Sequence, residues 1–129
     1  MRLRQLVIAT SEIGPLADSI CDLFELRRTF SDPELIIFGL KNVLIPLGDT
    51  FLELVTPVKV NTAAERFLNK RNGDGGYMVI VDSLDFDKER KRLKTVELDI
   101  VWHENRKTEG IHGQSLHLHP KQVGGAILS

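Results

Sequence analysis

Two halves of this 129-residue chain repeat one order of elements: a strand, a helix and then a set of strands. This repeat limits the possible folds most, because a strand–helix–strands unit leaves one apolar face of its sheet uncovered. Two such units side by side can curve into one sheet with the helices outside. The sequence therefore predicts an α+β fold of two βαβββ modules that form a cupped mixed β-sheet. We expect a single domain over residues 1–129, with modules at about 1–60 and 75–129.

In the first half, alternating apolar residues predict strands on both sides of a helix. Ser11 is expected to cap this helix, which has Pro15 in its first turns and an apolar stripe that includes Ile13 and Ile20. The expected strands of this half are residues 3–9, 35–40, 43–47 and 51–55.

A short helix at 62–70 and a glycine-rich stretch at 72–76 connect the halves. No Lys-Ser or Lys-Thr pair follows the glycines, so this stretch predicts a flexible linker rather than a phosphate-binding loop. The expected elements of the second half are a strand at 77–81, a charged helix at 86–96 and strands at 99–103, 115–119 and 126–128.

Composition narrows the partners and the location. The chain has 17 basic and 18 acidic residues and a formal charge of −1, which argues against binding to nucleic acid or to an acidic membrane surface. Cys21 is the only cysteine, so no intramolecular disulfide can form. No apolar run approaches the ~20 residues that cross a bilayer. We therefore expect a cytoplasmic protein, and whether the native chain continues beyond Ser129 stays open.

Three segments carry a resemblance to a known family. They are LGDTFLELVTP at 47–57, FLNKRNGDGG at 67–76 and GIHGQSLHLHPKQVGG at 110–125. Together with the order of elements, they resemble the vicinal oxygen chelate superfamily (glyoxalases, bleomycin-resistance proteins and dioxygenases), and within it most closely the methylmalonyl-CoA epimerases. The resemblance implies a glyoxalase-like fold, a homodimer and a small-molecule ligand in the cup of the sheet.

The resemblance also implies a divalent metal, such as Co, Mn, Zn, Ni or Mg, held by one residue from each of four strands. Such an ion polarises a substrate oxygen. Gln5 and Glu53 stand at the first two ligand positions. Gly76 and Ser129 stand at the other two, so two of four ligands are retained. Ile37 stands where the epimerases have an acid–base carboxylate, and no catalytic residue is assigned.

A histidine-rich hairpin is a second candidate site. His117 and His119 are two residues apart on an expected strand, so their side chains would share a face and could bind an ion or an anion. Lys121 follows them and could contact a coenzyme A phosphate. The alternative interpretation is structural: His119 precedes Pro120 at the end of the strand, and His117 lies on a half-exposed sheet face.

Two classes of function remain open. The first is a glyoxalase-like domain with a divergent or degenerate metal site that binds a small apolar or anionic molecule in the cup. The second is a metal-dependent isomerase or lyase acting on an acyl-CoA or a small carboxylate. The substitutions at Gly76 and Ser129 favour the first class, whereas Glu53 and the histidine-rich hairpin favour the second. Whether the chain is an enzyme is left open.

Overall fold

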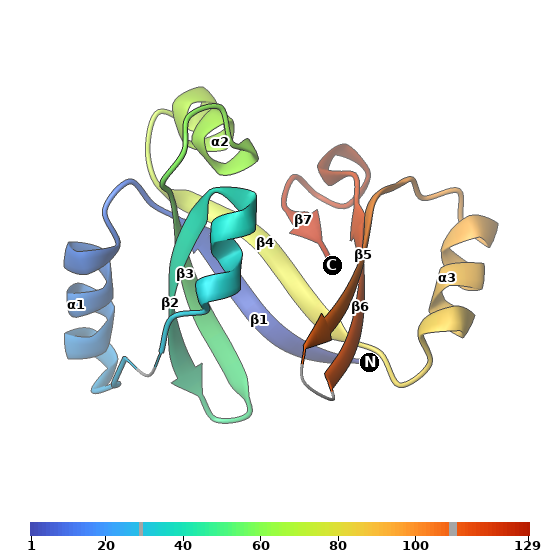
Figure 1. Cartoon of the computed structure of the whole chain (residues 1–129), viewed down its shortest axis with the longest axis horizontal. Helices are drawn as coiled ribbons and strands as arrows, with labels where there is room; N and C mark the ends of the chain where they lie inside the picture. Colours follow the sequence, from blue (N-terminus) through green and yellow to red (C-terminus); the bar gives the residue numbers. More distant parts are fainter. Residues whose placement is uncertain (29, 109–110) are drawn as a thin grey trace. The chain divides into compact units, whose positions relative to one another are not determined.

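The computed structural model describes residues 1–28, 30–108 and 111–129 (Figure 1). The chain divides into two compact units, one of Arg4–Tyr77 and the other of Met1–Leu3 with Met78–Ser129. Each unit combines a sheet with helices, so the predicted α+β class is confirmed.

The unit Arg4–Tyr77 is built on three strands in the order β2-β3-β1. Its elements are β1 (Arg2–Ala9), α1 (Ile13–Phe24), η1 (Pro33–Phe38), β2 (Leu40–Leu47), β3 (Thr50–Pro57) and α2 (Ala63–Arg71). The central strand β3 pairs antiparallel with β2 and parallel with β1. This mixed pairing places residues from three distant parts of the sequence next to one another.

Helix α1 packs on β2 and β3 and covers one face of this sheet (Figure 1). Four buried residues form the centre of that contact: Ile13 and Ala17 from α1, Ile45 from β2 and Leu54 from β3. Burial of an aliphatic side chain of this size stabilises a fold by about 1.5–3 kcal/mol. The apolar stripe of α1 therefore supplies most of what holds the helix in place.

The start of α1 differs from the prediction. Glu12, not Ser11, is the N-cap residue, and no side chain caps the helix there. The Ser11 backbone N–H instead donates to Asp74 Oδ1 (3.0 Å), and Thr10 Oγ1 donates to Asp74 Oδ2 (2.6 Å). Arg71 Nε donates to the Asp74 carbonyl oxygen (2.8 Å). The stretch at 72–76, predicted as a flexible linker, is thus anchored to the turn between β1 and α1.

The strand expected at 35–40 is wrong, because most of this segment forms the 3₁₀ helix η1. Asp32 caps the first turn through its side chain, and a proline follows it, which is a typical helix start. Gly39 ends the helix in the left-handed region with φ +69°. These start and stop signals outweigh the strand preference of the apolar run. An isolated bridge between Phe30 and Leu44 is the only β pairing described just before η1.

The other unit follows the predicted strand–helix–strands order. Its elements are β4 (Gly75–Asp82), which begins in the preceding unit, and then α3 (Phe86–Thr95), β5 (Ile100–Thr108), β6 (Ile111–Leu118), η2 (Pro120–Gln122) and β7 (Ile127–Leu128). The strand order is β4-β7-β6-β5. β7 pairs parallel with β4 and antiparallel with β6. Arg2 Nε contacts Asp82 Oδ2 at 3.2 Å and joins the first residues of the chain to this unit.

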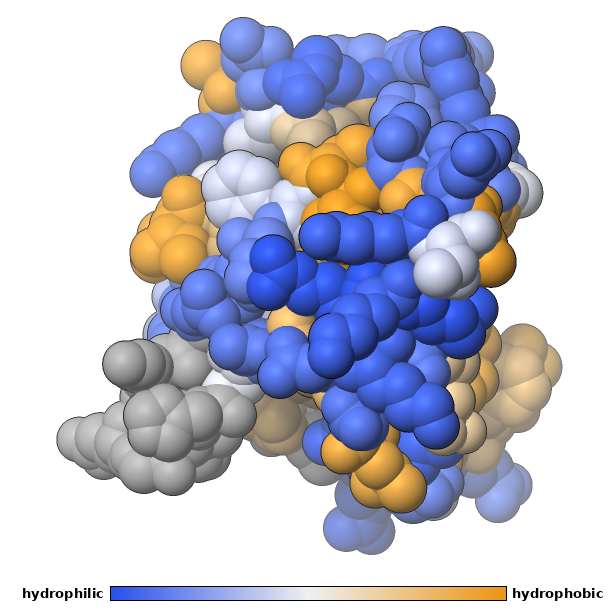
Figure 2. All heavy atoms as spheres, turned by 90° about the vertical axis from the view of Figure 1, so that its right-hand side faces the viewer, coloured by the Kyte–Doolittle hydropathy of each residue, from blue (hydrophilic) through white to orange (hydrophobic). Residues whose placement is uncertain are grey.

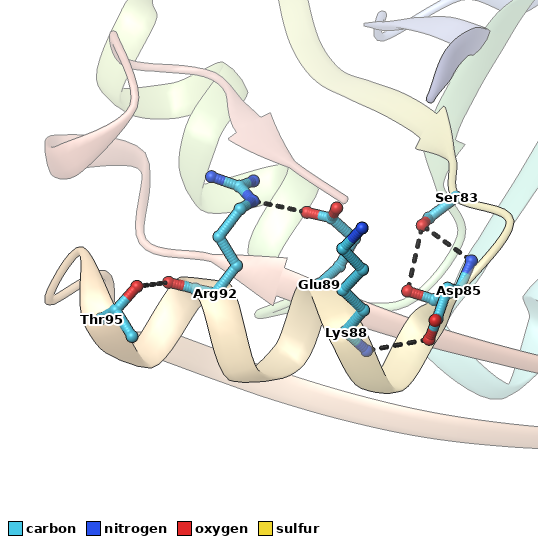
Figure 3. Close-up of polar contacts among 6 residues, drawn as sticks. All are labelled: Ser83, Asp85, Lys88, Glu89, Arg92 and Thr95. Atoms are coloured by element: carbon cyan, nitrogen blue, oxygen red, sulfur yellow. Dashed lines mark hydrogen bonds and ion pairs between the residues drawn. The ribbon is translucent and has the colours of Figure 1, made fainter.

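Helix α3 is stabilised by its own polar side chains as well as by packing (Figure 3). Asp85 Oδ1 accepts a hydrogen bond from the Lys88 backbone N–H (2.9 Å), which caps the first turn. Arg92 Nε contacts Glu89 Oε2 at 2.7 Å, one turn apart on the exposed surface. The buried side of the contact is a core cluster of Leu93, Leu116 and Leu118.

Hydrophilic side chains cover most of the face shown in Figure 2, which is the side on which α3 lies in Figure 1. The sequence of α3 explains this, because six of its ten residues are charged and most of these are exposed. Within the described ranges, no helix is long and apolar enough to cross a membrane.

Candidate functional site

The sheet face turned away from α1 carries the polar candidate site of the unit Arg4–Tyr77. Neighbouring residues of a strand point to opposite faces. Ile45 and Leu54 pack toward α1, so Glu53, next to Leu54, points to the other face. Gln5 on β1 and Asn42 on β2 reach the same carboxylate from the two flanking strands.

The Glu53 carboxylate is held between two side-chain amides. Gln5 Nε2 donates to Glu53 Oε2 at 2.8 Å, and Asn42 Nδ2 donates to Glu53 Oε1 at 2.6 Å. Glu53 is 6% exposed and Asn42 is 3% exposed, whereas Gln5 is half-buried. Both carboxylate oxygens accept hydrogen bonds, which is the role of an ionised carboxyl group. The two amides therefore fix a buried acidic group in one orientation.

Asn42 extends this network to η1, and sequence reasoning missed it. Its Oδ1 accepts a hydrogen bond from the Asp32 backbone N–H (2.8 Å), and the Asp32 side chain in turn caps η1. One planar amide thus joins the start of η1 to the carboxylate of Glu53. A signal was present: Asn42 interrupts the apolar alternation of β2, and a buried polar side chain in a strand needs a partner.

Apolar side chains surround the carboxylate on the same face. Val7 and Leu44 are the direct cross-strand neighbours of Glu53 on β1 and β2, and Val55 lies two residues further along β3. Their exposed fractions are 4%, 7% and 2%. The site therefore consists of one oriented carboxylate with two amides in an apolar wall.

The residues present do not make a divalent metal site by themselves. Gln5 and Glu53, the two predicted ligands, do come together, but the amide nitrogen rather than the oxygen of Gln5 faces the carboxylate. Across the described part of the chain, no three His, Cys, Asp or Glu side chains are placed to hold an ion. Structural zinc sites use four ligands, and calcium takes six to eight oxygens. Their assignment as metal ligands stays a prediction.

In the other unit, His117 lies on the sheet face opposite α3. Its neighbours along β6, Leu116 and Leu118, pack in the α3 core, so the His117 ring points away from it. Trp102 is its cross-strand partner on β5. Burial lowers the pKa of His117 below its usual value, and the negative charge of Glu104 opposes that shift. A half-buried, neutral imidazole beside an exposed indole is what this arrangement offers.

The other residues of the histidine-rich hairpin have separate positions. His119 Nδ1 accepts a hydrogen bond from the Lys121 backbone N–H (3.2 Å) and so caps η2, while the Lys121 side chain is exposed. The ring of His103 stacks on Phe86 of α3, with centroids 5.8 Å apart. The side chain of His112 lies outside the described residues. Ligand binding by His117, His119 and Lys121 stays a prediction.

No protein-family model matches the sequence, and no curated protein matches it either. Solved structures do match. The methylmalonyl-CoA epimerase of Mycobacterium tuberculosis is similar with a TM-score of 0.82 and 20% identity, over 98% of this chain and 84% of that chain. The Streptomyces coelicolor epimerase in complex with 2-nitronate-propionyl-CoA has a TM-score of 0.83 and 17% identity, over 99% of this chain and 94% of that chain. A hypothetical protein from Bacillus halodurans has a TM-score of 0.84 and 19% identity, over 98% and 90% of the two chains. Identities this low establish the fold, and the predicted glyoxalase-like fold of the vicinal oxygen chelate superfamily is confirmed.

Proposed function

We propose that this chain, which has the fold of the methylmalonyl-CoA epimerases, binds a small molecule at the Glu53 face without a resident divalent metal. The observation that carries the proposal is the buried Glu53 carboxylate, oriented by Gln5 and Asn42 in an apolar wall. Small-molecule sites combine mainly apolar walls with a few placed polar groups. The Glu53 face has this composition.

Two features support binding over epimerase chemistry. The position at which the resemblance implies an acid–base carboxylate holds Ile37, which lies in η1 rather than on a strand. The position implied for the third metal ligand holds Gly76, which has no side chain. General acid–base catalysis needs a titratable group at the reacting carbon, and the resemblance assigns none here.

The second candidate function is a metal-dependent isomerase or lyase acting on an acyl-CoA or a small carboxylate. The contact between Gln5 and Glu53 favours it, since rotation of the Gln5 amide would turn its oxygen toward an ion shared with the carboxylate. The Streptomyces coelicolor epimerase, which has the same fold, was solved with a coenzyme A ligand. Such an ion would supply Lewis-acid polarisation of a substrate oxygen.

Metal uptake separates the two candidates. Elemental analysis and calorimetric titration with Co²⁺, Mn²⁺ and Zn²⁺ are applied to the wild type, to Glu53→Gln and to Glu12→Gln, an exposed control in the same unit. Under the first proposal, none of the three proteins takes up near-stoichiometric metal. Uptake by the wild type and by Glu12→Gln that is lost in Glu53→Gln would instead establish the second candidate, and acyl-CoA turnover would be assayed next.

We also propose that residues 1–129 act as one domain in a cytoplasmic homodimer. β2 and β5 each stand at the end of a strand order, and an open strand edge favours pairing with another chain. Light scattering coupled to size-exclusion chromatography gives the mass in solution. A monomer over the whole accessible concentration range would remove the dimer from the proposal.

A further inference from the structure

The charge balance at the Glu53 face limits what a ligand can present to it. Among the three polar side chains that meet there, Glu53 is the one that carries a charge, and Gln5 and Asn42 each direct an N–H group to it. The oxygen of Asn42 accepts from the Asp32 backbone. An ionised carboxylate has about four acceptor positions, so two amide donors do not saturate it.

The apolar wall strengthens this limit. Val7, Leu44 and Val55 are buried around the carboxylate, so a ligand group beside Glu53 interacts with it through little water. Charges separated by a medium of low dielectric constant attract or repel more strongly than charges in water. A carboxylate placed directly beside Glu53 is therefore strongly disfavoured, and a hydrogen-bond donor or a positive charge is favoured.

Access comes from the β1 side of the site. Gln5 is half-buried, whereas Asn42 and Glu53 are buried. The oxygen of the Gln5 amide adds a second acceptor on the more open side. A primary ammonium group has three donors and can contact the Glu53 carboxylate and this oxygen together.

We propose that the ligand presents a primary ammonium group on an apolar body to Glu53, and that a ligand carboxylate does not contact this face directly. This inference deepens the proposed function and rests on it. Gln5 and Asn42 are positioning residues in this account, because they orient the carboxylate that receives the ligand.

Three probes with the same straight four-carbon body test the inference: n-butylammonium, 1-butanol and butyrate. Each is titrated into the ¹⁵N-labelled protein at constant ionic strength without divalent metal, and amide chemical shifts are followed. We expect butylammonium to shift the amide signals of Glu53, Leu44 and Gln5. It should bind about tenfold or more tightly than butyrate, with butanol between them, a ratio that corresponds to about 1.4 kcal/mol.

Glu53→Gln should abolish the preference for butylammonium over butyrate, and Glu12→Gln should retain it. Gln5→Leu is the second variant, in case Glu53→Gln does not fold. It keeps the carboxylate and removes one acceptor, so butylammonium binding should weaken while its preference over butyrate remains. Circular dichroism and thermal melting establish that each variant is folded.

The failures of the two proposals look different. If butyrate binds the wild type more tightly than butylammonium at the same amides, the ammonium inference is overturned and the proposed binding function stands. If butylammonium binding persists unchanged in Glu53→Gln, the inference is also overturned, because the cation then binds elsewhere. If no probe shifts the Glu53 face of the folded wild type, both the inference and the proposed function fail.

Discussion

Helices α1 and α3 follow the first strands of the two halves of the sequence, yet they start in different ways. Asp85 at the start of α3 accepts a hydrogen bond from a backbone N–H three residues later. Glu12 at the start of α1 makes no such bond, and Asp74, distant in sequence, holds the preceding turn through Thr10 and Ser11. The first arrangement is local in sequence and the second depends on the folded unit.

The two helices also differ in what covers them. The apolar stripe of α1 packs into a core that includes the fully buried Leu54 and Ile45. α3 is highly charged and carries its own ion pair between Glu89 and Arg92. The comparison teaches that α1 is a product of tertiary packing, whereas α3 has much of its support within its own sequence.

The largest effect should come from emptying the α1 core. Leu54 is 0% exposed, and we expect Leu54→Ala to lower the free energy of unfolding by about 2–5 kcal/mol. Urea denaturation followed by circular dichroism measures it. Val60→Ala, at a position that is 86% exposed, is the control and should change stability by less than about 0.5 kcal/mol. A loss below about 1 kcal/mol for Leu54→Ala would show that α1 does not depend on this core.

Removal of the long-range tether should come next. Asp74→Ala leaves the Thr10 hydroxyl, on a residue 1% exposed, and the Ser11 N–H without their acceptor, so a loss of about 1–3 kcal/mol is expected. Asp74→Asn keeps one acceptor oxygen and should lose less. Equal losses for the two variants in urea denaturation would argue against the hydrogen bonds as the cause.

A matched pair of N-cap variants sharpens the comparison directly. Asp85→Ala removes a side-chain cap and should destabilise the protein by about 0.5–2 kcal/mol. Glu12→Ala, at the N-cap of α1, removes no such bond and should stay within about 0.5 kcal/mol. Thermal melts of both variants would contradict the contrast if Glu12→Ala were the more destabilising change.

The smallest effect concerns His117 and acid. Burial lowers its pKa in the folded state, so the unfolded chain binds the proton more readily. The stability that His117 contributes is therefore complete above its unfolded pKa of about 6.5 and is lost as the pH falls through the lower folded pKa. Denaturation midpoints measured across this window should fall toward acid, and less steeply in His117→Gln. An identical pH profile in the variant would assign the acid sensitivity to other groups.

The parts of the fold that sequence could predict are those with local signals. The order of the second half and the charged helix at 86–96 followed from periodicity and composition. Gln5 and Glu53 were paired through the resemblance, and the structure brings them to 2.8 Å. Asn42 and Asp74 were missed because their partners lie on other elements, in the case of Asp74 and Ser11 63 residues away.

The error at 35–40 has a different origin. An apolar run of this length suits a strand or a helix equally, and the two are separated by the residues at its ends. Asp32 and Gly39 are helix start and stop signals, and they decided the outcome. The same stretch carries the Ile37 position, so the 3₁₀ helix also changes the backbone on which the resemblance would place a catalytic group.

The tether from Asp74 to the β1–α1 turn has a consequence for biosynthesis. Chains leave the ribosome from the N-terminus at roughly 5–20 residues per second, so the 63 residues between Ser11 and Asp74 take on the order of 3–13 s to follow. During that interval the nascent α1 has a strand before it but nothing to close its first turn. The folding of this unit is therefore timed by the arrival of its last loop.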